Sequence, residues 1–414
     1  MPTLFKRLLL QRFHSIPAES ISLTNPAFFV GCNGSGKSNL VDAFAFLSEC
    51  VENPLQAVFD RRGGVFSVVT RTPTRGASDE LRWRDMRPTM GLGLEVVDLP
   101  TITGDDEMVS ARYSFQVRAV GRYVFEVVRK QYIIRHQDGK TEWFERGEKD
   151  FRSNIEFLAG FPQSAPTSLA FPLLGSFPPF AFLKHVISNM RVYSIEASKL
   201  RSPQDPDVGS RLRSDGRNAA SVLSEIRESS PHDFERIGEL LGAVSDGVRR
   251  VWTVKQGRQL ALKFGQEWDG NKRLTFDAFS MSDGTLRALG LILAVYQTPS
   301  PALLAIEEPE ASIHPGAHGV LLDLLRDATR RMQVVMTTHS PEVLDAKWIG
   351  ENNLRVVTLR EGATRVGAIS EFSRAALREQ LMGAGELLRT NSLEQAPLFD
   401  ADDPDTIPLF QEVD

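Results

Sequence analysis

The sequence predicts an α/β fold: a core sheet flanked by helices, with an antiparallel β lobe and a helical lobe attached to it. Three observations support this class. Continuously apolar runs lie at residues 27–30, 302–306 and 333–337, each before a helical segment. This pattern is typical of buried parallel strands. Short segments with strand-like alternation follow one another between residues 91 and 145, as in an antiparallel meander. Two helical segments lie at 218–229 and 232–247.

The same patterns assign the remaining elements in chain order. Strands are predicted at 4–13, 91–97, 111–120, 122–135, 141–145 and 191–197, and hairpins at 251–264 with 273–279 and at 353–359 with 364–370. Further helices are predicted at 38–50, 284–297 and 315–331. Irregular structure is expected at 62–77, 160–181 and 199–218, the last as a mobile loop rich in proline and glycine. The acidic, proline-containing stretch 391–414 is predicted to be disordered.

Composition limits the classes of protein to consider. The chain has 414 residues, 42% of them hydrophobic and 24% charged, which are ordinary values for a globular protein with a sizeable core. A net charge of −5 argues against a protein covered in positive charge, although a local basic groove remains compatible with it. With only two cysteines, Cys32 and Cys50, and no stretch long enough for a signal peptide or a membrane span, a cytoplasmic location is expected.

The first chemistry-bearing motif is a glycine-rich loop between a predicted strand and a predicted helix, Gly31-Cys32-Asn33-Gly34-Ser35-Gly36-Lys37-Ser38. Glycines let phosphate oxygens approach backbone N–H groups, and the positive end of the following helix attracts anions. Lys37 is expected to reach the β- and γ-phosphates, and the Ser38 hydroxyl is expected to bind Mg²⁺. The loop therefore predicts a site for ATP with Mg²⁺.

The second motif places two carboxylates, Glu307 and Glu308, after the apolar strand at 302–306. Neighbouring strand residues point to opposite faces, so the two side chains can take different roles. Glu307 is expected to face the Mg²⁺ ion, and Glu308 to polarise the attacking water. Taken alone, the pair would be a strand that ends in solvated acids. Downstream of a phosphate loop, the catalytic interpretation is favoured.

Two further motifs are ambiguous on their own. Ser282 and Gly284 precede an apolar helix, which makes either an anion site or an ordinary helix cap. His339 stands at the end of the strand 333–337. It is either structural or a partner of the γ-phosphate and the water.

Together the four motifs resemble the ABC-type ATPases of the SMC/RecF/OLD branch, in their compact form without a long coiled coil. The matching residues are GCNGSGKSNLVDAF at 31–44, SMSDGTLR at 280–287, LLAIEEPEASIHP at 303–315, TTHSPEVLD at 337–345, and in addition Gln11-Arg12-Phe13 and GELLRT at 385–390. The resemblance implies one ATPase head over residues 1–390. Its nucleotide-binding core would be 1–60 and 281–390, its β lobe 61–150, and its helical, signature-bearing lobe 151–280.

The resemblance also implies residue roles and a dimer. Nucleotide contacts are expected from the loop and the following residue: Asn33, Gly34, Ser35, Gly36, Lys37, Ser38 and Asn39. Ser282 and Gly284 are similar to the ABC signature, which acts on the ATP of a partner subunit, and 310–312 to the D-loop at the dimer seam. His339 is similar to the switch histidine. Glu307 replaces the Asp of many relatives, and Asp283 replaces a second Gly of the transporters. The Q-loop glutamine stays open among Gln56, Gln116 and Gln131.

Two hypotheses about function remain. The first is an ATP-dependent homodimer that senses or clamps DNA or RNA in DNA repair or anti-phage defence. Its effector would be a separate polypeptide, since the residues after His339 carry no nuclease-like carboxylate set. The second is a nucleotide-dependent assembly scaffold with slow hydrolysis and no contact with DNA. A transporter subunit fits poorly, because the signature and the meander differ. The only hint of nucleic acid is a set of basic residues, which could equally form an ordinary solvated surface. They are Arg61, Arg62, Arg71, Arg75, Arg82, Arg84, Arg87, Lys199, Arg201, Arg211, Arg213 and Arg217.

Overall fold

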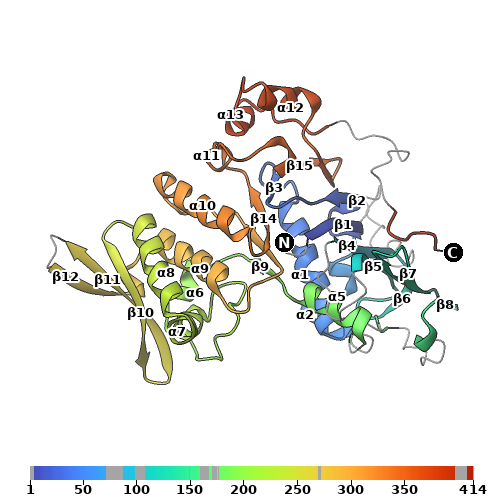
Figure 1. Cartoon of the computed structure of the whole chain (residues 1–414), viewed down its shortest axis with the longest axis horizontal. Helices are drawn as coiled ribbons and strands as arrows, with labels where there is room; N and C mark the ends of the chain where they lie inside the picture. Colours follow the sequence, from blue (N-terminus) through green and yellow to red (C-terminus); the bar gives the residue numbers. More distant parts are fainter. Residues whose placement is uncertain are drawn as a thin grey trace, which may run out of the picture. The chain divides into compact units, whose positions relative to one another are not determined.

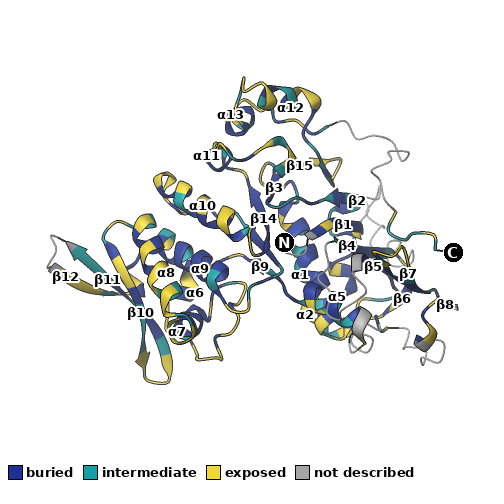
Figure 2. Cartoon of the chain, in the orientation of Figure 1, coloured by how far each residue is buried: buried dark blue, intermediate teal, exposed yellow. Residues whose placement is uncertain are grey.

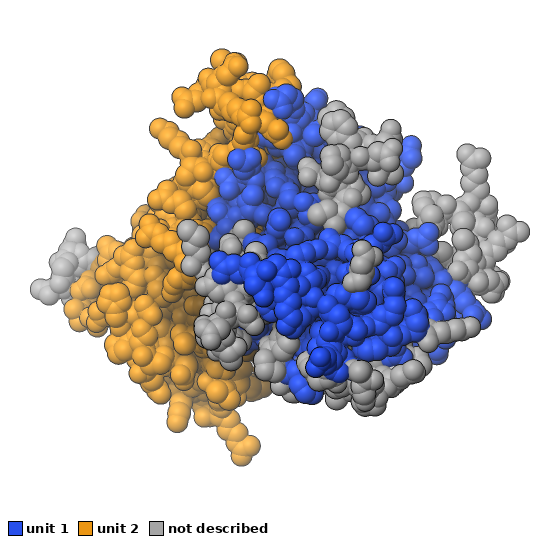
Figure 3. All heavy atoms as spheres, turned by 45° about the vertical axis from the view of Figure 1, so that its right-hand side comes forward, with its two compact units in different colours: residues 1–190, 352–371, 394–414 blue, residues 191–351, 372–393 orange. Residues whose placement is uncertain are grey.

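The structure is a computed structural model that describes residues 4–70, 87–97, 108–148, 150–158, 167–169, 175, 177–268, 272–396 and 408–413. The chain divides into two compact units (Figure 3). The first comprises residues 1–190, 352–371 and 394–414, and the second comprises 191–351 and 372–393. The basic positions Arg71, Arg75, Arg82 and Arg84 lie outside the described residues.

The first unit contains a seven-stranded antiparallel sheet in the order β2-β1-β4-β5-β6-β7-β8 (Figure 1). Its strands are β1 Leu4–Phe13, β2 Ile16–Ser22, β4 Thr89–Val97, β5 Met108–Ala119, β6 Phe125–His136, β7 Thr141–Arg146 and β8 Phe151–Ser153. The meander predicted over 91–145 is confirmed. The sheet also includes β1 and β2, with Leu8 of β1 opposite Leu94 of β4.

One face of this sheet is apolar and packs against helices α1 Lys37–Glu52, α2 Leu55–Arg61 and α5 Pro178–Ser188. Aromatic rings join the layers: Phe59 lies 4.8 Å from Phe125, and Tyr132 lies 4.4 Å from Phe180, measured between ring centroids. Figure 2 shows the buried residues on these elements in dark blue. Burying such a ring stabilises the fold by about 2–3 kcal/mol. Phe46 of α1 joins this layer, with its ring centroid 5.7 Å from that of Phe59, so the layer also holds the helix that follows the phosphate loop.

The opposite face of the sheet is polar and nevertheless buried. Alternate positions on adjacent strands carry Arg7, Glu95, Arg112, Ser114 and Gln131, each at most 9% exposed. In a sheet with one apolar face, the second face is usually solvated. The C-terminal residues 408–413 contact this polar face, at Arg112 and Gln131 among the five residues named.

The first unit also carries the strands next to the phosphate loop. β3 Ala27–Val30 pairs in parallel with β15 Leu354–Arg360, and Phe28 lies opposite Leu354. β15 turns back into β16 Ala363–Gly367, which confirms the predicted closing hairpin. All four residues of β3 are buried, as its apolar sequence requires.

The second unit contains the parallel pair β13 Leu303–Glu307 and β14 Gln333–Thr338. Its helices are α6 Ala197–Arg201, α7 Ala219–Ser229, α8 Pro231–Val244, α9 Asp283–Tyr296, α10 His318–Ala328, α11 Pro341–Leu344, α12 Glu371–Arg378 and α13 Ala384–Arg389. A three-stranded antiparallel sheet is formed by β10 Val248–Gln256, β11 Gln259–Trp268 and β12 Lys272–Asp277, where a hairpin at 251–264 and 273–279 was predicted. β9 Met190–Tyr193 is shorter than the predicted strand.

Two segments differ from the sequence prediction. The stretch 199–218 was expected to be a mobile loop, but buried amides hold it in place. Gln204 Nε2 donates to Lys199 O at 2.8 Å, and Asn218 Nδ2 donates to Arg211 O at 2.8 Å. The tail was expected to be disordered from residue 391, whereas residues 391–396 and 408–413 have defined positions. Within the described ranges, the helices are too short or too polar to cross a membrane.

Candidate functional site

The phosphate loop lies in the first unit, between β3 and α1. Gly34 and Gly36 have φ angles of 77° and 100°, a region that side chains with a Cβ rarely adopt. A Cβ on Gly36 would lie 2.0 Å from Thr364 Oγ1, and a Cβ on Gly31 would lie 2.2 Å from Val357 O. Gly31 and Gly36 are therefore required by the local packing, whereas a Cβ on Gly34 would meet nothing within 4 Å.

A chain of hydrogen bonds braces this loop from behind. Thr364 Oγ1 donates to the Ser35 carbonyl at 3.0 Å, and the hydroxyls of Thr364 and Ser15 lie 2.6 Å apart. Asn39 Nδ2 donates to Ser15 Oγ at 2.7 Å. The side chain of Asn39, a predicted nucleotide contact, therefore faces this brace. Thr364 and Ser15 belong to no motif, so neither residue could be predicted from a sequence pattern.

The loop presents donors that fit a polyphosphate. Lys37 is 6% exposed, and its ammonium donates to Gly31 O at 2.8 Å and Cys32 O at 3.0 Å, which holds the charge against the loop. Ser38 and Asn33 are exposed. The hydroxyl of Ser35 is buried and has no hydrogen-bond partner in the part of the chain that is described. The helix that starts at Lys37 has 16 residues and directs its positive end at the loop.

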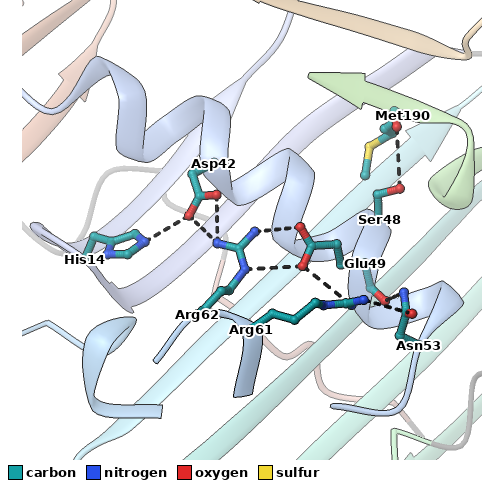
Figure 4. Close-up of polar contacts among 8 residues, drawn as sticks. All are labelled: His14, Asp42, Ser48, Glu49, Asn53, Arg61, Arg62 and Met190. Atoms are coloured by element: carbon teal, nitrogen blue, oxygen red, sulfur yellow. Dashed lines mark hydrogen bonds and ion pairs between the residues drawn. The ribbon is translucent and has the colours of Figure 1, made fainter. Parts of the chain in front are cut away.

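A network of ion pairs fixes α1 further along (Figure 4). Arg62 bridges two carboxylates of this helix, Asp42 at 2.7 Å and Glu49 at 2.9 Å, while His14 Nε2 lies 3.0 Å from Asp42 Oδ2. Burial alone would raise the pKa of Asp42, but the hydrogen bond from His14 and the charge of Arg62 outweigh it and lower that pKa. Arg62, a candidate for nucleic-acid contact, is therefore engaged inside the protein.

The predicted catalytic residues lie in the second unit, at the carboxyl ends of β13 and β14. Glu307 is opposite Thr337 in the parallel register. The backbone N–H of Glu308 donates to Thr337 O at 3.1 Å, and Glu308 has a φ angle of 43°. His339 Nδ1 lies 2.9 Å from Glu308 Oε1, and both side chains remain partly exposed, at 42% and 34%. The structure thus brings Glu308 and His339 together as a solvent-accessible acid–base pair.

A third carboxyl lies behind this pair. Glu310, expected at the D-loop, is 7% exposed, and its Oε1 accepts a 2.6 Å hydrogen bond from Thr338 Oγ1. Burial raises the pKa of Glu310, and the Thr338 hydrogen bond opposes this only in part. A buried carboxyl of this kind supports the strand ends and is not itself open to a substrate.

The signature turn precedes α9. Ser282 accepts a 3.1 Å hydrogen bond from the backbone N–H of Thr285, so it caps the helix. A Cβ on Gly284 would lie 2.4 Å from the carbonyl oxygen of Ser312. The glycine therefore lets the start of α9 approach the backbone of the D-loop segment. Both readings of the motif, cap and functional turn, remain compatible with this geometry.

Arg201 stabilises the same turn. It forms an ion pair with Asp283 and donates to Phe279 O at 2.8 Å and Met281 O at 3.0 Å. The sequence analysis counted Arg201 among the basic residues that could contact nucleic acid. Its guanidinium is instead used to hold the signature turn.

The candidate Q-loop glutamines lie in the first unit. Gln56 Nε2 donates to Asp60 Oδ1 at 2.8 Å. Gln116 donates to Gln11 at 2.9 Å on the polar face of the antiparallel sheet. Gln131 lies on the same face and contacts the C-terminal segment. The structure therefore assigns Gln116 and Gln131 local partners within the sheet.

Comparisons with known proteins agree with the fold. A family model described as "AAA domain, putative AbiEii toxin, Type IV TA system" matches residues 27–150 and 185–345. An Smc head bound to the C-terminal winged-helix domain of ScpA aligns with a TM-score of 0.54 and 14% identity, covering 90% of this chain and 99% of that one. An Smc head with an extended coiled coil, bound to the C-terminal domain of ScpA from Pyrococcus furiosus, aligns with a TM-score of 0.52 and 12% identity, covering 92% and 99%.

At these identities the likeness to solved structures establishes the fold alone, and this fold is the ABC-type ATPase head that the sequence predicted. None of the curated protein sequences matches the chain. The family model, in contrast, covers more than half of the 414 residues. The chain therefore belongs to the AAA-domain family described by that model.

Proposed function

We propose that this protein binds and hydrolyses ATP. The observation that carries the proposal is the contact between Glu308 and His339, 2.9 Å apart after two parallel strands, in a chain that also has a phosphate loop at 31–38. A carboxylate held by an imidazole is suited to orient and deprotonate a water molecule. Membership of an AAA-domain family supports the same activity.

In this proposal the phosphate loop provides the binding site. The backbone N–H groups of the loop and the positive end of α1 bind the phosphates, and Lys37 contributes its charge to the β- and γ-phosphates. The exposed hydroxyl of Ser38, in the first unit, and the carboxylate of Glu307, in the second, are each suited by their chemistry to bind Mg²⁺. When bound, Mg²⁺ supplies charge neutralisation at the phosphate oxygens.

Glu308 then acts on the water, and His339 supports it. An ionised Glu308 accepts from the protonated Nδ1 of His339, which leaves Nε2 to face the γ-phosphate or the water. The partial exposure of both side chains allows them to reach a substrate.

We further propose that the active unit is a homodimer with two composite sites. Ser282 and Gly284 would complete the ATP site of the other copy, in a head-to-tail pair with two-fold symmetry. This rests on the exposed position of Ser282 at the N-terminus of a 14-residue helix and on the resemblance of 280–287 to the ABC signature.

For the wider role we propose nucleic-acid sensing in DNA repair or anti-phage defence, with a separately encoded protein as effector. The Smc heads that this fold resembles were solved with a domain of ScpA, which makes a protein partner reasonable here. A nucleotide-dependent scaffold is the second candidate. It is favoured by the internal use of Arg62 and Arg201, which removes two residues from the basic set.

The test of ATP hydrolysis uses two variants with different expected defects. Lys37→Ala should lose ATP binding, whereas Glu308→Gln should keep it and lower steady-state turnover at least about 100-fold. Normal affinity in Lys37→Ala would contradict the binding site. Unchanged turnover in Glu308→Gln together with loss in Glu307→Gln would mean that the two glutamates exchange roles. Stimulation of wild-type turnover by DNA would favour sensing over the scaffold.

The composite site is tested by mixing two inactive variants. Lys37→Ala and Ser282→Arg should each be inactive alone, and the mixture should regain part of the activity, because one site of the heterodimer is then intact. Light scattering with ATP and Mg²⁺ should show dimers of Glu308→Gln. Full ATPase activity of Ser282→Arg as a monomer would rule out the composite site and leave residues 282–285 as a helix cap.

A further inference from the structure

The C-terminal segment 408–413 contacts the polar face of the antiparallel sheet through its backbone. Gln131 Nε2 donates to Gln411 O at 2.6 Å, and the backbone N–H of Gln411 donates to Gln131 Oε1 at 2.9 Å. One side-chain amide thus satisfies both backbone groups of a single residue, as a neighbouring strand would. Arg112 donates to the carbonyl of Pro408 at the other end of the contact. These bonds fix the path of the segment across β5 and β6.

Side-chain contacts give this path a sequence preference. A Cβ on Gly91 would lie 2.2 Å from Leu409 Cδ2, so Leu409 occupies the space that this glycine leaves in β4. The guanidinium of Arg129 lies 4.3 Å from the centroid of the Phe410 ring. Arg135 Nη2 donates to Gln411 Oε1 at 2.7 Å. Three consecutive residues of the segment therefore contact three different residues of the sheet: Leu409 contacts Gly91, Phe410 contacts Arg129, and Gln411 contacts Arg135.

The sheet is built to receive this segment. β4 carries glycine at 91, and a glycine inside a strand often marks a place where another backbone or a ligand approaches closely. Gln131 is itself held by Glu145 Oε2 at 2.7 Å. Arg112 is 1% exposed, and its Nε and Nη1 lack hydrogen-bond partners among the described residues. Buried polar groups are usually hydrogen-bonded, so the Pro408 carbonyl is a partner that Arg112 needs at this position.

We propose that this polar face is a peptide-binding site that recognises the sequence Pro408-Leu409-Phe410-Gln411, and that the C-terminal segment is its tethered, exchangeable ligand. Backbone bonds supply affinity and side-chain contacts supply selectivity, as in other extended peptides bound at sheets. Along the sequence, eleven positions separate residue 396 from residue 408. A short tether gives an effective concentration of about 1 mM, so a segment with a Kd of about 10 μM would keep about 99% of the sites occupied.

Exchange can be measured on the full-length chain. The double change Leu409→Asp and Phe410→Asp should release the segment and leave the site open. A fluorescein-labelled peptide of residues 406–414 should then bind this variant about 100-fold more tightly than wild type, because the wild-type site is already occupied. The same peptide with aspartate in place of Leu409 should not bind. Fluorescence anisotropy provides the readout, and no nucleotide is required, so the result does not depend on ATPase activity.

Changes in the site itself provide the controls. On the released background, Gly91→Val should fill the space for Leu409, and Gln131→Ala should remove both backbone bonds, so each should abolish peptide binding. Gln116→Ala is the matched control, because its amide lies on the same face and bonds to Gln11. It should bind the peptide normally. Circular dichroism and thermal unfolding check that each variant folds.

Hydrogen exchange on wild type gives a second measurement that needs no variant. Amide exchange at 409–413 should be slowed relative to a free peptide of the same sequence, and adding excess peptide should accelerate it. Equal peptide affinity for wild type and the released variant, binding that survives Gly91→Val, or unprotected exchange at 409–413 would each overturn the proposal.

Discussion

His339 Nδ1 lies 2.9 Å from Glu308 Oε1, so an imidazole and a carboxylate are in direct contact where two parallel strands end. The register of β13 and β14, with Glu307 opposite Thr337, brings the residues that follow each strand side by side. The positive φ of Glu308 turns the chain at that point. The contact thus follows from two strands that are each defined by their own apolar sequence.

Because the two side chains touch, their effects on turnover should not add. Glu308→Gln is expected to lower kcat by at least about 100-fold and His339→Ala by a smaller factor. The double variant should be no slower than Glu308→Gln, because the histidine acts through the carboxylate. Steady-state ATPase assays on the four proteins test this. Multiplicative losses would show that His339 acts separately, for example directly on the phosphate.

Gly284 should be needed for packing at the start of α9, although glycine has a poor helix propensity. Alanine favours a helix over glycine by about 1 kcal/mol, but a Cβ here would lie 2.4 Å from the backbone oxygen of Ser312. Gly284→Ala should therefore lower the free energy of unfolding by about 1–3 kcal/mol. Gly319→Ala in α10 is the matched control, since its Cβ meets nothing within 4 Å, and it should stabilise by up to about 1 kcal/mol. Urea unfolding distinguishes the two, and stabilisation by both would contradict the close approach.

Thr364 should support the phosphate loop without touching nucleotide. Thr364→Val keeps the shape of the side chain but leaves the Ser35 carbonyl and the Ser15 hydroxyl without their partner. A loss of about 1–2 kcal/mol in unfolding free energy is expected, together with weaker ATP binding. Ser15→Ala should have the same direction of effect. Titration with a fluorescent ATP analogue measures it, and full affinity in both variants would mean that the brace is dispensable.

Lys130 should make stability depend on pH. Burial, with a smaller contribution from the charge of Arg146, lowers the pKa of Lys130 to about 7, and its ammonium donates to Ser168 O at 2.9 Å. Between pH 7 and the ordinary lysine pKa near 10.4, the unfolded chain binds this proton and the folded chain does not. Unfolding free energy should therefore rise with pH across this window. Lys130→Met should reduce the rise, which unfolding curves at pH 7, 8 and 9 would detect. An identical slope in both proteins would contradict the low pKa.

The elements that could be predicted from the sequence are those whose residues act locally. The apolar runs gave β3, β13 and β14, and the glycine spacing of 31–38 gave the phosphate loop. Thr364 and Ser15 could not be predicted, because they act through contacts between distant parts of the chain. Thr364 bonds to Ser35 and to Ser15, each more than 300 positions away. Arg62 and Arg201 were misassigned for the same reason, since an arginine that is paired internally looks like an exposed one in sequence.

The defined position of the C-terminal segment could not be predicted from the sequence for a different reason. Its acidic, proline-containing composition predicts disorder, because few of its residues can contribute to a core. The structure gives residues 408–413 a position because the sheet supplies the partners, above all Gln131 and the space at Gly91. Gly91 inside β4 was the available signal, and a glycine at such a position indicates a close approach without identifying what approaches.

The bond between Thr364 and Ser35 also sets an order of events during synthesis. The loop at residues 31–38 leaves the ribosome early, but its rear support lies in the hairpin of β15 and β16. At about 5–20 residues per second, the nascent chain waits roughly 15–65 s between the two. During that interval the loop has its glycines but lacks the threonine that braces it. A half-made chain on the ribosome is therefore expected to bind nucleotide more weakly than the finished chain.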